Sequence, residues 1–324
     1  MEEKVAGKEP IDLGKRVWLI DGYDSGLPER TGIYVIEEEE LTLVETGPSP
    51  SVPYIRAGLE RLGYTLEQVK YIILTHIHLD HAGGAGLLLA DCPNATIVAH
   101  PKAVRHLVDP TRLIAGAQAV YGALFDSLFA PIVAVPQERI VAKHDGETLQ
   151  IGPACTLQFL DTPGHANHHF SIYDPVSNGM FTGDTAGVYY CQLAREGVPF
   201  FLPSTSPNQF DPDKMRSAIA RYREMKLDRL YFGHFGMSEQ VEEAYRQVLR
   251  WLPIFVEEGE KAYAAGRGYE QLRDSLFARV KDELRQQGVD EEHELFSYIR
   301  IDAEVSAMGL LDYMQKREAA NAQA

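Results

Sequence analysis

The sequence predicts a mixed α/β protein that ends in a helical segment. Short runs of β-branched and aromatic residues alternate with segments of helical apolar spacing in two successive halves, up to about residue 240. Beyond that point the apolar residues recur only at helical spacing. With 324 residues, 45% of them hydrophobic, the chain can bury a large core. We therefore expect an α/β domain over residues 1–240 and a C-terminal helical extension over residues 241–324 packed on it.

The first half of the chain predicts a β-meander followed by alternating helices and strands. We expect strands at residues 17–20, 32–36, 41–44, 69–74 and 95–100, and helices at residues 52–62 and 85–90. Thr65 is the expected N-cap of a short helical turn. His100 ends one of these strands and is interpreted as a structural residue near the site described below.

The second half repeats this pattern before the chain becomes helical. We expect strands at residues 139–141, 149–151, 155–160, 169–173 and 179–182, and helical stripes at residues 241–255, 272–280 and 295–305. Asp211 is the expected cap of another helix, with Pro212 at its first position. Pro253 should bend or end the first C-terminal helix. The tail at residues 317–324 is small and polar, so we expect no order there.

Residues Leu113–Phe129 predict an unusually apolar helix. A helix of this kind packs in a core, walls a substrate cleft or forms a dimer surface, and its sequence does not choose among the three. If it walls a cleft, Tyr121 and Phe125 are the side chains that we expect to contact substrate.

A cluster of metal-binding side chains follows the strand expected at residues 69–74. The cluster contains His76, His78, Asp80 and His81, and it is followed by Gly83 and Gly84. Side chains two residues apart in an extended backbone point the same way, so His76 and His78 can bind one ion together. A turn at Leu79 should present the other two side chains elsewhere, and the glycines should allow a tight bend.

Three later strand ends carry the same kinds of side chain. They are His165 after Thr162-Pro163-Gly164, Asp184 after Thr182-Gly183, and His234 after Phe232-Gly233. Together with the His-x-His-x-Asp-His cluster, these motifs resemble, in order, those of the metallo-β-lactamase superfamily. The resemblance covers most of residues 15–240 and implies a four-layer αββα sandwich. The helical C-terminal segment is similar in architecture to the extension of hydroxyacylglutathione hydrolases, where it helps to hold the substrate.

By position, the resemblance implies a dinuclear metal centre. One ion would be held by His76, His78 and His165, the other by Asp80, His81 and His234, with Asp184 bridging them. Imidazole and carboxylate ligands suit zinc, iron or manganese, and without cysteine ligands we expect two Zn²⁺ ions. Two ions about 3.5–4 Å apart lower the pKa of a shared water and deliver hydroxide to a carbonyl or phosphorus. The implied reaction is hydrolysis of a small thioester, lactone, β-lactam or phosphodiester, with Asp80 also orienting the water or accepting its proton.

The chain departs from the family pattern at two positions. Glu45 stands where many members have an aspartate that orients a metal ligand. His168 stands where glycine is usual, beside His169, which falls on a normally structural histidine. We interpret His168 as a residue packed near the site, with substrate contact as the alternative. Tyr189 and Tyr190 follow Asp184 and can donate a hydrogen bond to a substrate oxygen, or pack with their hydroxyls in water.

Two other classes of function stay open at this point. A persulfide dioxygenase-like enzyme shares this fold but uses a single iron held by two histidines and a carboxylate. A non-catalytic sensor would keep the metal site without turnover. The complete set of seven ligands favours the dinuclear hydrolase.

Composition limits the partners that we expect. The chain has 31 Lys and Arg against 47 Asp and Glu, a net charge of −16, which disfavours nucleic acid. The partner is therefore expected to be a small-molecule substrate, with a homodimer as a further alternative. The three cysteines show no paired spacing and predict reduced thiols in a cytoplasmic protein. The charged start, Met1–Lys8, predicts no signal peptide, and the sequence shows no membrane span.

Overall fold

The structure, a computed structural model, describes residues 7–322, and its contacts divide the chain into two compact units. The first unit comprises Met1–Asp161, His168–Gly183 and Leu227–Glu239, and the second comprises Thr162–Asn167, Asp184–Lys226 and Gln240–Ala324. The chain passes into the second unit for the last time between Glu239 and Gln240, next to the boundary that we predicted. The second unit also contains the two earlier segments Thr162–Asn167 and Asp184–Lys226. The division into domains at residues 1–240 and 241–324 therefore stays a prediction. The expected absence of a signal peptide concerns residues that lie mostly outside the described part.

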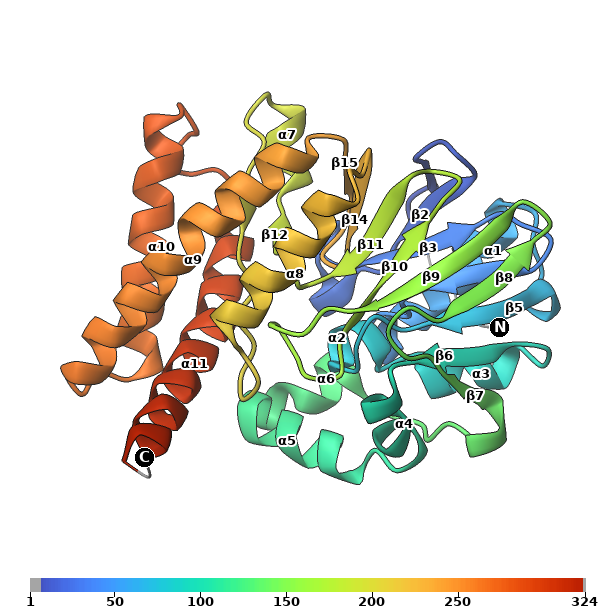
Figure 1. Ribbon diagram of the computed structural model, residues 1–324, viewed down its shortest axis with the longest axis horizontal. Helices are drawn as coiled ribbons and strands as arrows, with labels where there is room; N and C mark the ends of the chain where they lie inside the picture. The colour runs from blue at the N-terminus through green and yellow to red at the C-terminus, as the bar shows by residue number, and fades with distance from the viewer. Residues whose placement is uncertain (1–6, 323–324) are drawn as a thin grey trace. The chain divides into compact units, whose positions relative to one another are not determined.

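Two β-sheets form the centre of the first unit (Figure 1). The first sheet has the spatial order β1 (Ile11–Asp12), β2 (Val17–Asp21), β3 (Gly32–Ile36), β4 (Leu41–Val44), β5 (Val69–Ile73), β6 (Thr96–Ala99) and β7 (Ile140–Ala142). The second has the order β15 (Met237–Ser238), β14 (Arg229–Phe232), β11 (Gly179–Gly183), β10 (Phe170–Asp174), β9 (Cys155–Asp161) and β8 (Thr148–Gly152). Strands β4 to β7 are mutually parallel, and β11 is parallel to β14. Ligand sites in such sheets lie beyond the carboxyl ends of the parallel strands.

Aromatic side chains join the two sheets, and helices cover the first. The ring of Tyr34 on β3 lies 5.2 Å from that of Phe181 on β11 and 5.6 Å from that of Tyr231 on β14. On the other face of the first sheet, Ile55 and Leu88 belong to the same buried core as the strands. They come from α1 (Val52–Arg61) and α3 (Ala85–Asp91), the two helices predicted there. The remaining helices of this unit are α2 (Leu79–Ala82), α4 (Pro101–Val108), α5 (Thr111–Tyr121) and α6 (Phe125–Phe129).

The prediction of one continuous helix at Leu113–Phe129 is wrong. Gly122 has φ 53° and ψ −128°, a conformation that ends α5 and is open to glycine but rarely to other residues. A short 3₁₀ turn follows before α6 begins. Phe125 and Phe129 are buried and pack against Leu79, so α6 belongs to the core of the first unit, whereas none of the residues of α5 is fully buried.

Helices make up most of the second unit. Its elements are β12 (Val188–Tyr189), α7 (Cys191–Arg195), β13 (Phe201–Leu202), α8 (Pro212–Glu224), α9 (Val241–Ala264), α10 (Tyr269–Gln286) and α11 (Leu295–Asn321). Asp211 caps α8 as predicted, because its side chain accepts hydrogen bonds from the backbone N–H groups of Asp213 and Lys214. Helix α9 continues through Pro253, so this proline does not end it.

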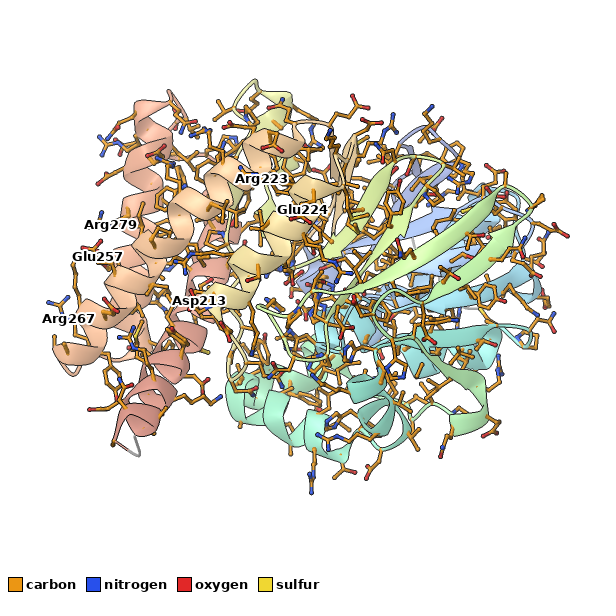
Figure 2. All side chains as sticks on the ribbon, in the orientation of Figure 1. Asp213, Arg223, Glu224, Glu257, Arg267 and Arg279 are labelled. Atoms are coloured by element: carbon orange, nitrogen blue, oxygen red, sulfur yellow. The ribbon has the colours of Figure 1, made fainter. Side chains whose placement is uncertain are left out.

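Ion pairs on the surface connect the helices of the second unit to one another. Arg223 of α8 lies 3.2 Å from Glu242 of α9, and Arg279 of α10 lies 2.8 Å from Glu258 of α9; both arginines are labelled in Figure 2. The expectation of a disordered tail is wrong for residues 317–321, which continue α11. Arg317 there pairs with Glu260 of α9 at 2.7 Å. Within residues 7–322, no helix has the length and apolar character that crossing a membrane requires.

Candidate metal centre

Two pairs of candidate ligands follow β5. His76 and His78 precede the helical turn α2, and Asp80 and His81 lie within it. His78 is extended, with φ −62° and ψ 146°, and its carbonyl accepts from the N–H groups of His81 and Ala82 in the helical turn α2. Gly83 and Gly84 have helical φ of −59° and −78°, so they do not supply the bend that we expected. They lack side chains for another reason. A Cβ at Gly83 would clash with the carbonyl oxygen of Leu79, and a Cβ at Gly84 would lie 3.0 Å from Cγ2 of Val52 and 3.2 Å from the carbonyl oxygen of Thr46.

His76 and His78 direct ring nitrogens at each other. Nε2 of His76 lies 3.0 Å from Nδ1 of His78, and Nδ1 of His76 lies 3.0 Å from the hydroxyl of Thr75. Two nitrogens bound to one tetrahedral zinc ion are about 3.3 Å apart, because each Zn–N bond is about 2.0–2.1 Å long. The observed separation is therefore close to that of two ligands of one ion.

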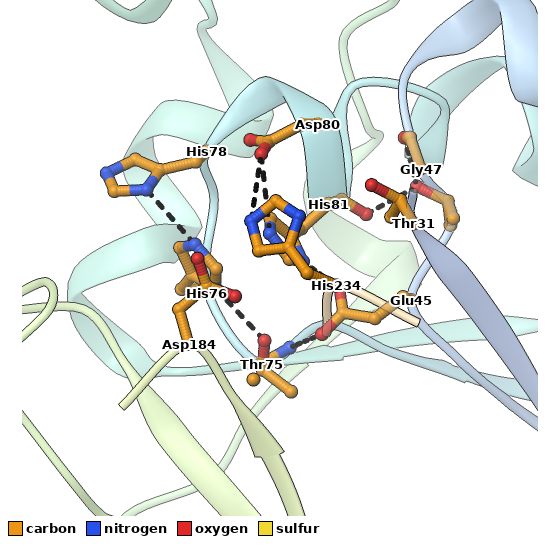
Figure 3. Close-up of polar contacts among 12 residues, drawn as sticks. Thr31, Glu45, Gly47, Thr75, His76, His78, Asp80, His81, Asp184 and His234 are labelled. Carbon is orange, nitrogen blue, oxygen red and sulfur yellow. Dashed lines mark hydrogen bonds and ion pairs between the residues drawn. The ribbon is translucent and has the colours of Figure 1, made fainter. Parts of the chain in front are cut away.

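Asp80, His81 and His234 form a second group in the first unit, as Figure 3 shows. Oδ2 of Asp80 lies 3.5 Å from Nε2 of His81 and 3.7 Å from Nε2 of His234. The ligand atoms of the three residues all lie within 4.8 Å of one another. His81 is fully buried, whereas the Asp80 side chain is 27% exposed. Asp80 is thus the member of this group that solvent reaches most easily.

Glu45 and Thr46 both contact His81. Oε2 of Glu45 lies 3.8 Å from Nδ1 of His81, and Oε1 accepts from the N–H of Thr75 at 3.2 Å. The N–H and hydroxyl of Thr46 both donate to the His81 carbonyl, at 2.9 Å and 3.0 Å. Glu45 has φ 72°, which is uncommon for a residue with a side chain and is typical of functional sites. The longer carboxylate therefore contacts both the strand end and a candidate ligand.

His234 is oriented by the segment before β3. Its Nδ1 lies 3.3 Å from the carbonyl oxygen of Arg30. Because a carbonyl only accepts, Nδ1 is the donor in this contact, and in a neutral imidazole that leaves the lone pair for a metal on Nε2. Arg30 in turn lies 3.5 Å from the buried carboxylate of Asp24. Burial raises the pKa of Asp24, and the Arg30 guanidinium opposes that rise.

The second unit contains its own pair of candidate ligands. Nε2 of His165 lies 3.5 Å from Oδ2 of Asp184, and both side chains are buried. Nδ1 of His165 donates to the carbonyl of Ser204 at 3.1 Å, which again leaves Nε2 with the lone pair. The hydroxyl of Ser204 donates to Oδ2 of Asp184 at 3.1 Å, and that of Ser206 donates to the His165 carbonyl at 2.6 Å.

The chemistry of these groups fits divalent metal ions. Imidazoles and carboxylates are donors that Zn²⁺, Fe²⁺ and Mn²⁺ accept. Hydrogen bonds from the ring N–H to a carbonyl are the usual support of a metal-binding histidine. His165 and His234 both have this support.

The predicted substrate residues lie in different surroundings. Nδ1 of His168 lies 3.5 Å from the N–H of Ile77, and its ring centroid lies 5.5 Å from that of His78, so His168 is packed beside the ligand loop. The Tyr190 hydroxyl donates to Asp302 at 2.9 Å, and Tyr189 stacks on Phe201 at 4.8 Å, both within the second unit. Substrate contact by these residues stays a prediction.

His100 has a structural role, as interpreted from the sequence. It caps α4 by accepting from the N–H of Lys102, and its Nε2 lies 3.3 Å from Oδ1 of Asp161. Tyr121 is half-buried and Phe125 is buried in the cluster around Leu79. Sequence reasoning missed Arg30, Tyr34 and Ser204, because each acts through its contact with a residue far along the chain.

Comparison with known proteins identifies the family. Residues 28–234 match the sequence model of the Metallo-beta-lactamase superfamily. The chain is 28% identical over 228 residues to the metallo-beta-lactamase fold-containing protein ST1585 of Sulfurisphaera tokodaii, which covers 68% of this chain and 80% of that protein. It is 30% identical over 168 residues to a hydroxyacylglutathione hydrolase of Cronobacter sakazakii, of which it spans about half, 51%.

Solved structures agree with the predicted fold. The crystal structure of ST1585 from Sulfolobus tokodaii superposes with a TM-score of 0.59 at 26% identity, over 71% of this chain and 85% of that one. The metallo-beta-lactamase family protein TTHA1429 of Thermus thermophilus superposes with a TM-score of 0.64 at 20% identity, over 94% of each chain. The predicted fold class is therefore confirmed. Because the family model spans both the first ligand cluster and His234, the chain belongs to the metallo-beta-lactamase superfamily.

Proposed function

We propose that this metallo-beta-lactamase-fold hydrolase cleaves small ester-like bonds with a dinuclear metal centre. The proposed ligands are His76, His78 and His165 for one ion, Asp80, His81 and His234 for the other, and Asp184 as the bridge. The observation that carries this proposal is the convergence of Asp80, His81 and His234 within 4.8 Å. Zinc is the proposed metal, because the set combines imidazoles with carboxylates and has no thiolate.

Asp80 is the proposed proton acceptor of the reaction. Bound divalent ions would polarise the substrate carbonyl or phosphoryl oxygen and lower the pKa of a water molecule. Asp80 directs Oδ2 at His81 and His234, so Oδ1 is its second acceptor. The Asp80 side chain is 27% exposed, so water can reach this carboxylate. Oδ1 would orient that water and accept its proton as the scissile bond is attacked.

The charge of the chain supports a small substrate. A net charge of −16 disfavours polyanions, so a thioester, lactone or compact phosphodiester is the proposed class. The partial similarity to a hydroxyacylglutathione hydrolase supports acyl derivatives of glutathione as the first compounds to test. A cytoplasmic location and a homodimer stay predictions from the sequence.

Metal counting combined with an activity panel tests this function. Protein expressed with added zinc should contain close to two ions per chain by elemental analysis. The loaded protein should hydrolyse at least one member of a panel of thioesters, lactones and phosphodiesters, and chelation should abolish that turnover. A plateau at one iron ion with oxygen uptake on a persulfide would contradict the proposal in favour of a dioxygenase. Absence of turnover across the whole panel in the two-ion protein would favour a sensor.

A further inference from the structure

The turn that carries His234 has an unfavourable backbone. It joins β14 to β15, and Phe235 has φ 65° while Gly236 has φ 95°. A phenylalanine in the left-handed region costs conformational energy, and it persists only where neighbouring structure holds it. Phe235 is 1% exposed, and it packs against β3 at Gly32, where a Cβ would lie 3.4 Å from Cα of Phe235 and would clash with Cδ1 of Leu19 at 2.6 Å.

The hydroxyl of Tyr34 contacts both ends of this turn. Its oxygen lies 2.6 Å from the carbonyl oxygen of Phe232 and 2.7 Å from that of Gly236, so its one proton is shared between these acceptors. Tyr34 is 1% exposed, and these contacts therefore form without competition from water. The N–H of Gly32, two residues earlier on β3, also donates to the carbonyl of Gly233 at 3.2 Å.

We propose that Tyr34 is a positioning residue for the metal site formed by Asp80, His81 and His234. The hydroxyl ties residues 232 and 236, on either side of His234, to the rigid strand β3. The carbonyl of Arg30, just before the same strand, fixes the ring of His234 through Nδ1. The backbone is thus held by β3 and the ring by the residue that lies two positions before it, and Nε2 lies 3.7 Å from Oδ2 of Asp80. This inference rests on the proposed dinuclear function.

A core role explains the ring of Tyr34 but not its hydroxyl. The ring packs edge-on against Phe181 and Tyr231, and a phenylalanine fills the same space. A buried hydroxyl is tolerated only when it is hydrogen-bonded, and here both acceptors belong to the turn of His234. Removing the hydroxyl alone therefore separates the two roles.

Stepwise Zn²⁺ titration of the full chain tests the inference. Apo protein is titrated in competition with a chelator to give two dissociation constants, and His234→Ala identifies which constant belongs to the site of His234. In Tyr34→Phe, that constant should rise about 10- to 100-fold, the range observed when a group that supports a metal ligand is removed, while the other stays unchanged. Tyr231→Phe is the matched control. Its ring packs in the same cluster, but its hydroxyl faces Ser177 and Arg229.

Each outcome of this titration decides the inference. Two unchanged constants in Tyr34→Phe overturn it. An equal rise in both constants, accompanied by a lower unfolding temperature of the apo protein, also overturns it, because the hydroxyl would then serve general stability. If the wild-type chain binds only one ion, the dinuclear proposal fails separately. The comparison is then made on that single constant, where a rise in Tyr34→Phe supports the inference and no change overturns it.

Discussion

The Oε2 atom of Glu45 lies 3.8 Å from Nδ1 of His81, while its Oε1 atom accepts a hydrogen bond from the N–H of Thr75 at 3.2 Å. One carboxylate thus contacts the end of β5, where the first ligand pair begins, and a ligand of the second group. An aspartate is one methylene shorter, so from the same backbone position its carboxylate reaches less far toward these two groups. The substitution of glutamate in this chain therefore changes how the ligand loop is supported.

Glu45→Gln should weaken zinc binding without unfolding the protein. The amide oxygen can still accept from Thr75, but the negative charge beside His81 is lost, and with it the polarisation of that imidazole. We expect a loss of about 10-fold or more in zinc affinity, measured by competition with a chelator. Thermal unfolding of the apo protein controls for stability. Wild-type affinity in the variant would show that Glu45 only caps the strand end.

Asp184→Ala should lose metal and activity together. Asp184 is 2% exposed and lies 3.5 Å from His165, so its removal leaves a buried histidine without this carboxylate beside it. Elemental analysis and turnover of the same preparation measure the two losses. Ser204→Ala is the milder companion, because it removes only the hydroxyl that donates to Asp184 at 3.1 Å. Full occupancy with wild-type turnover in Asp184→Ala would exclude the bridging role.

Local patterns in the sequence predict most strands and bring out the candidate ligand cluster. The strands expected at residues 32–36 and 41–44 coincide with β3 and β4, because alternation and flanking turn residues are local signals. The capping roles of Thr65 and Asp211 are also confirmed, since a cap depends on residues only two or three positions away. The break at Gly122 is missed, because helical apolar spacing continues on both sides of it.

The residues that position the candidate ligands cannot be predicted from local sequence patterns. Tyr34 and Phe232 are separated by 198 residues, and only the packing of two sheets brings them together. Arg30 acts through its backbone carbonyl, which every residue has, so its identity gives no signal. The glycines after His81 are prominent in the sequence, yet a side chain is excluded there by the close approach of Leu79 and Thr46, which only the structure shows.

Acid should weaken the ion pair that Arg16 forms with Asp174. The side chain of Asp174 is fully buried and lies 2.9 Å from the Arg16 guanidinium. Burial alone would raise the pKa of Asp174, but hydrogen bonds from Arg16 and Ser177 outweigh it and hold the pKa below the ordinary 3.8. At pH values above 3.8 the ionised carboxylate therefore stabilises the fold. This contribution to stability is lost as the pH falls through the lowered pKa of Asp174.

Arg16→Met should therefore destabilise the protein most at neutral pH. It leaves a buried carboxylate without its partner, at a cost of about 3–5 kcal/mol. Without the arginine, burial raises the pKa of Asp174, so protonation near pH 4 should relieve part of the cost. Denaturant unfolding at pH 7 and pH 4 measures both effects. The control Arg56→Met breaks a half-exposed pair with Asp91 and should cost about 0–1 kcal/mol. Equal losses in the two variants would contradict this account.

The apolar cluster around Leu79 connects the ligand loop to α5 and α6. Leu79 stands between the candidate ligands His78 and Asp80 and packs with Phe125 and Phe129. The ring of Tyr121, at the end of α5, lies 4.9 Å from that of Phe129 but stays half-buried. Tyr121 therefore offers apolar surface near the loop, whereas Phe125 has little left to offer a substrate.

Substitutions at these two residues should have different effects. Tyr121→Ala should raise KM about 10-fold or more for substrates with an apolar acyl or aryl group, because burying such a group contributes roughly 25 cal/mol per Å². Small polar substrates and metal content should be unaffected, as expected for lost uniform binding. Phe125→Ala should instead cost about 3–5 kcal/mol of stability, measured by denaturant unfolding. Gln118→Ala, on the exposed side of α5, controls for helix propensity. If Tyr121→Ala lowers stability and leaves the ratio of KM values unchanged, this cluster serves only the fold, and the preference for apolar substrates is wrong.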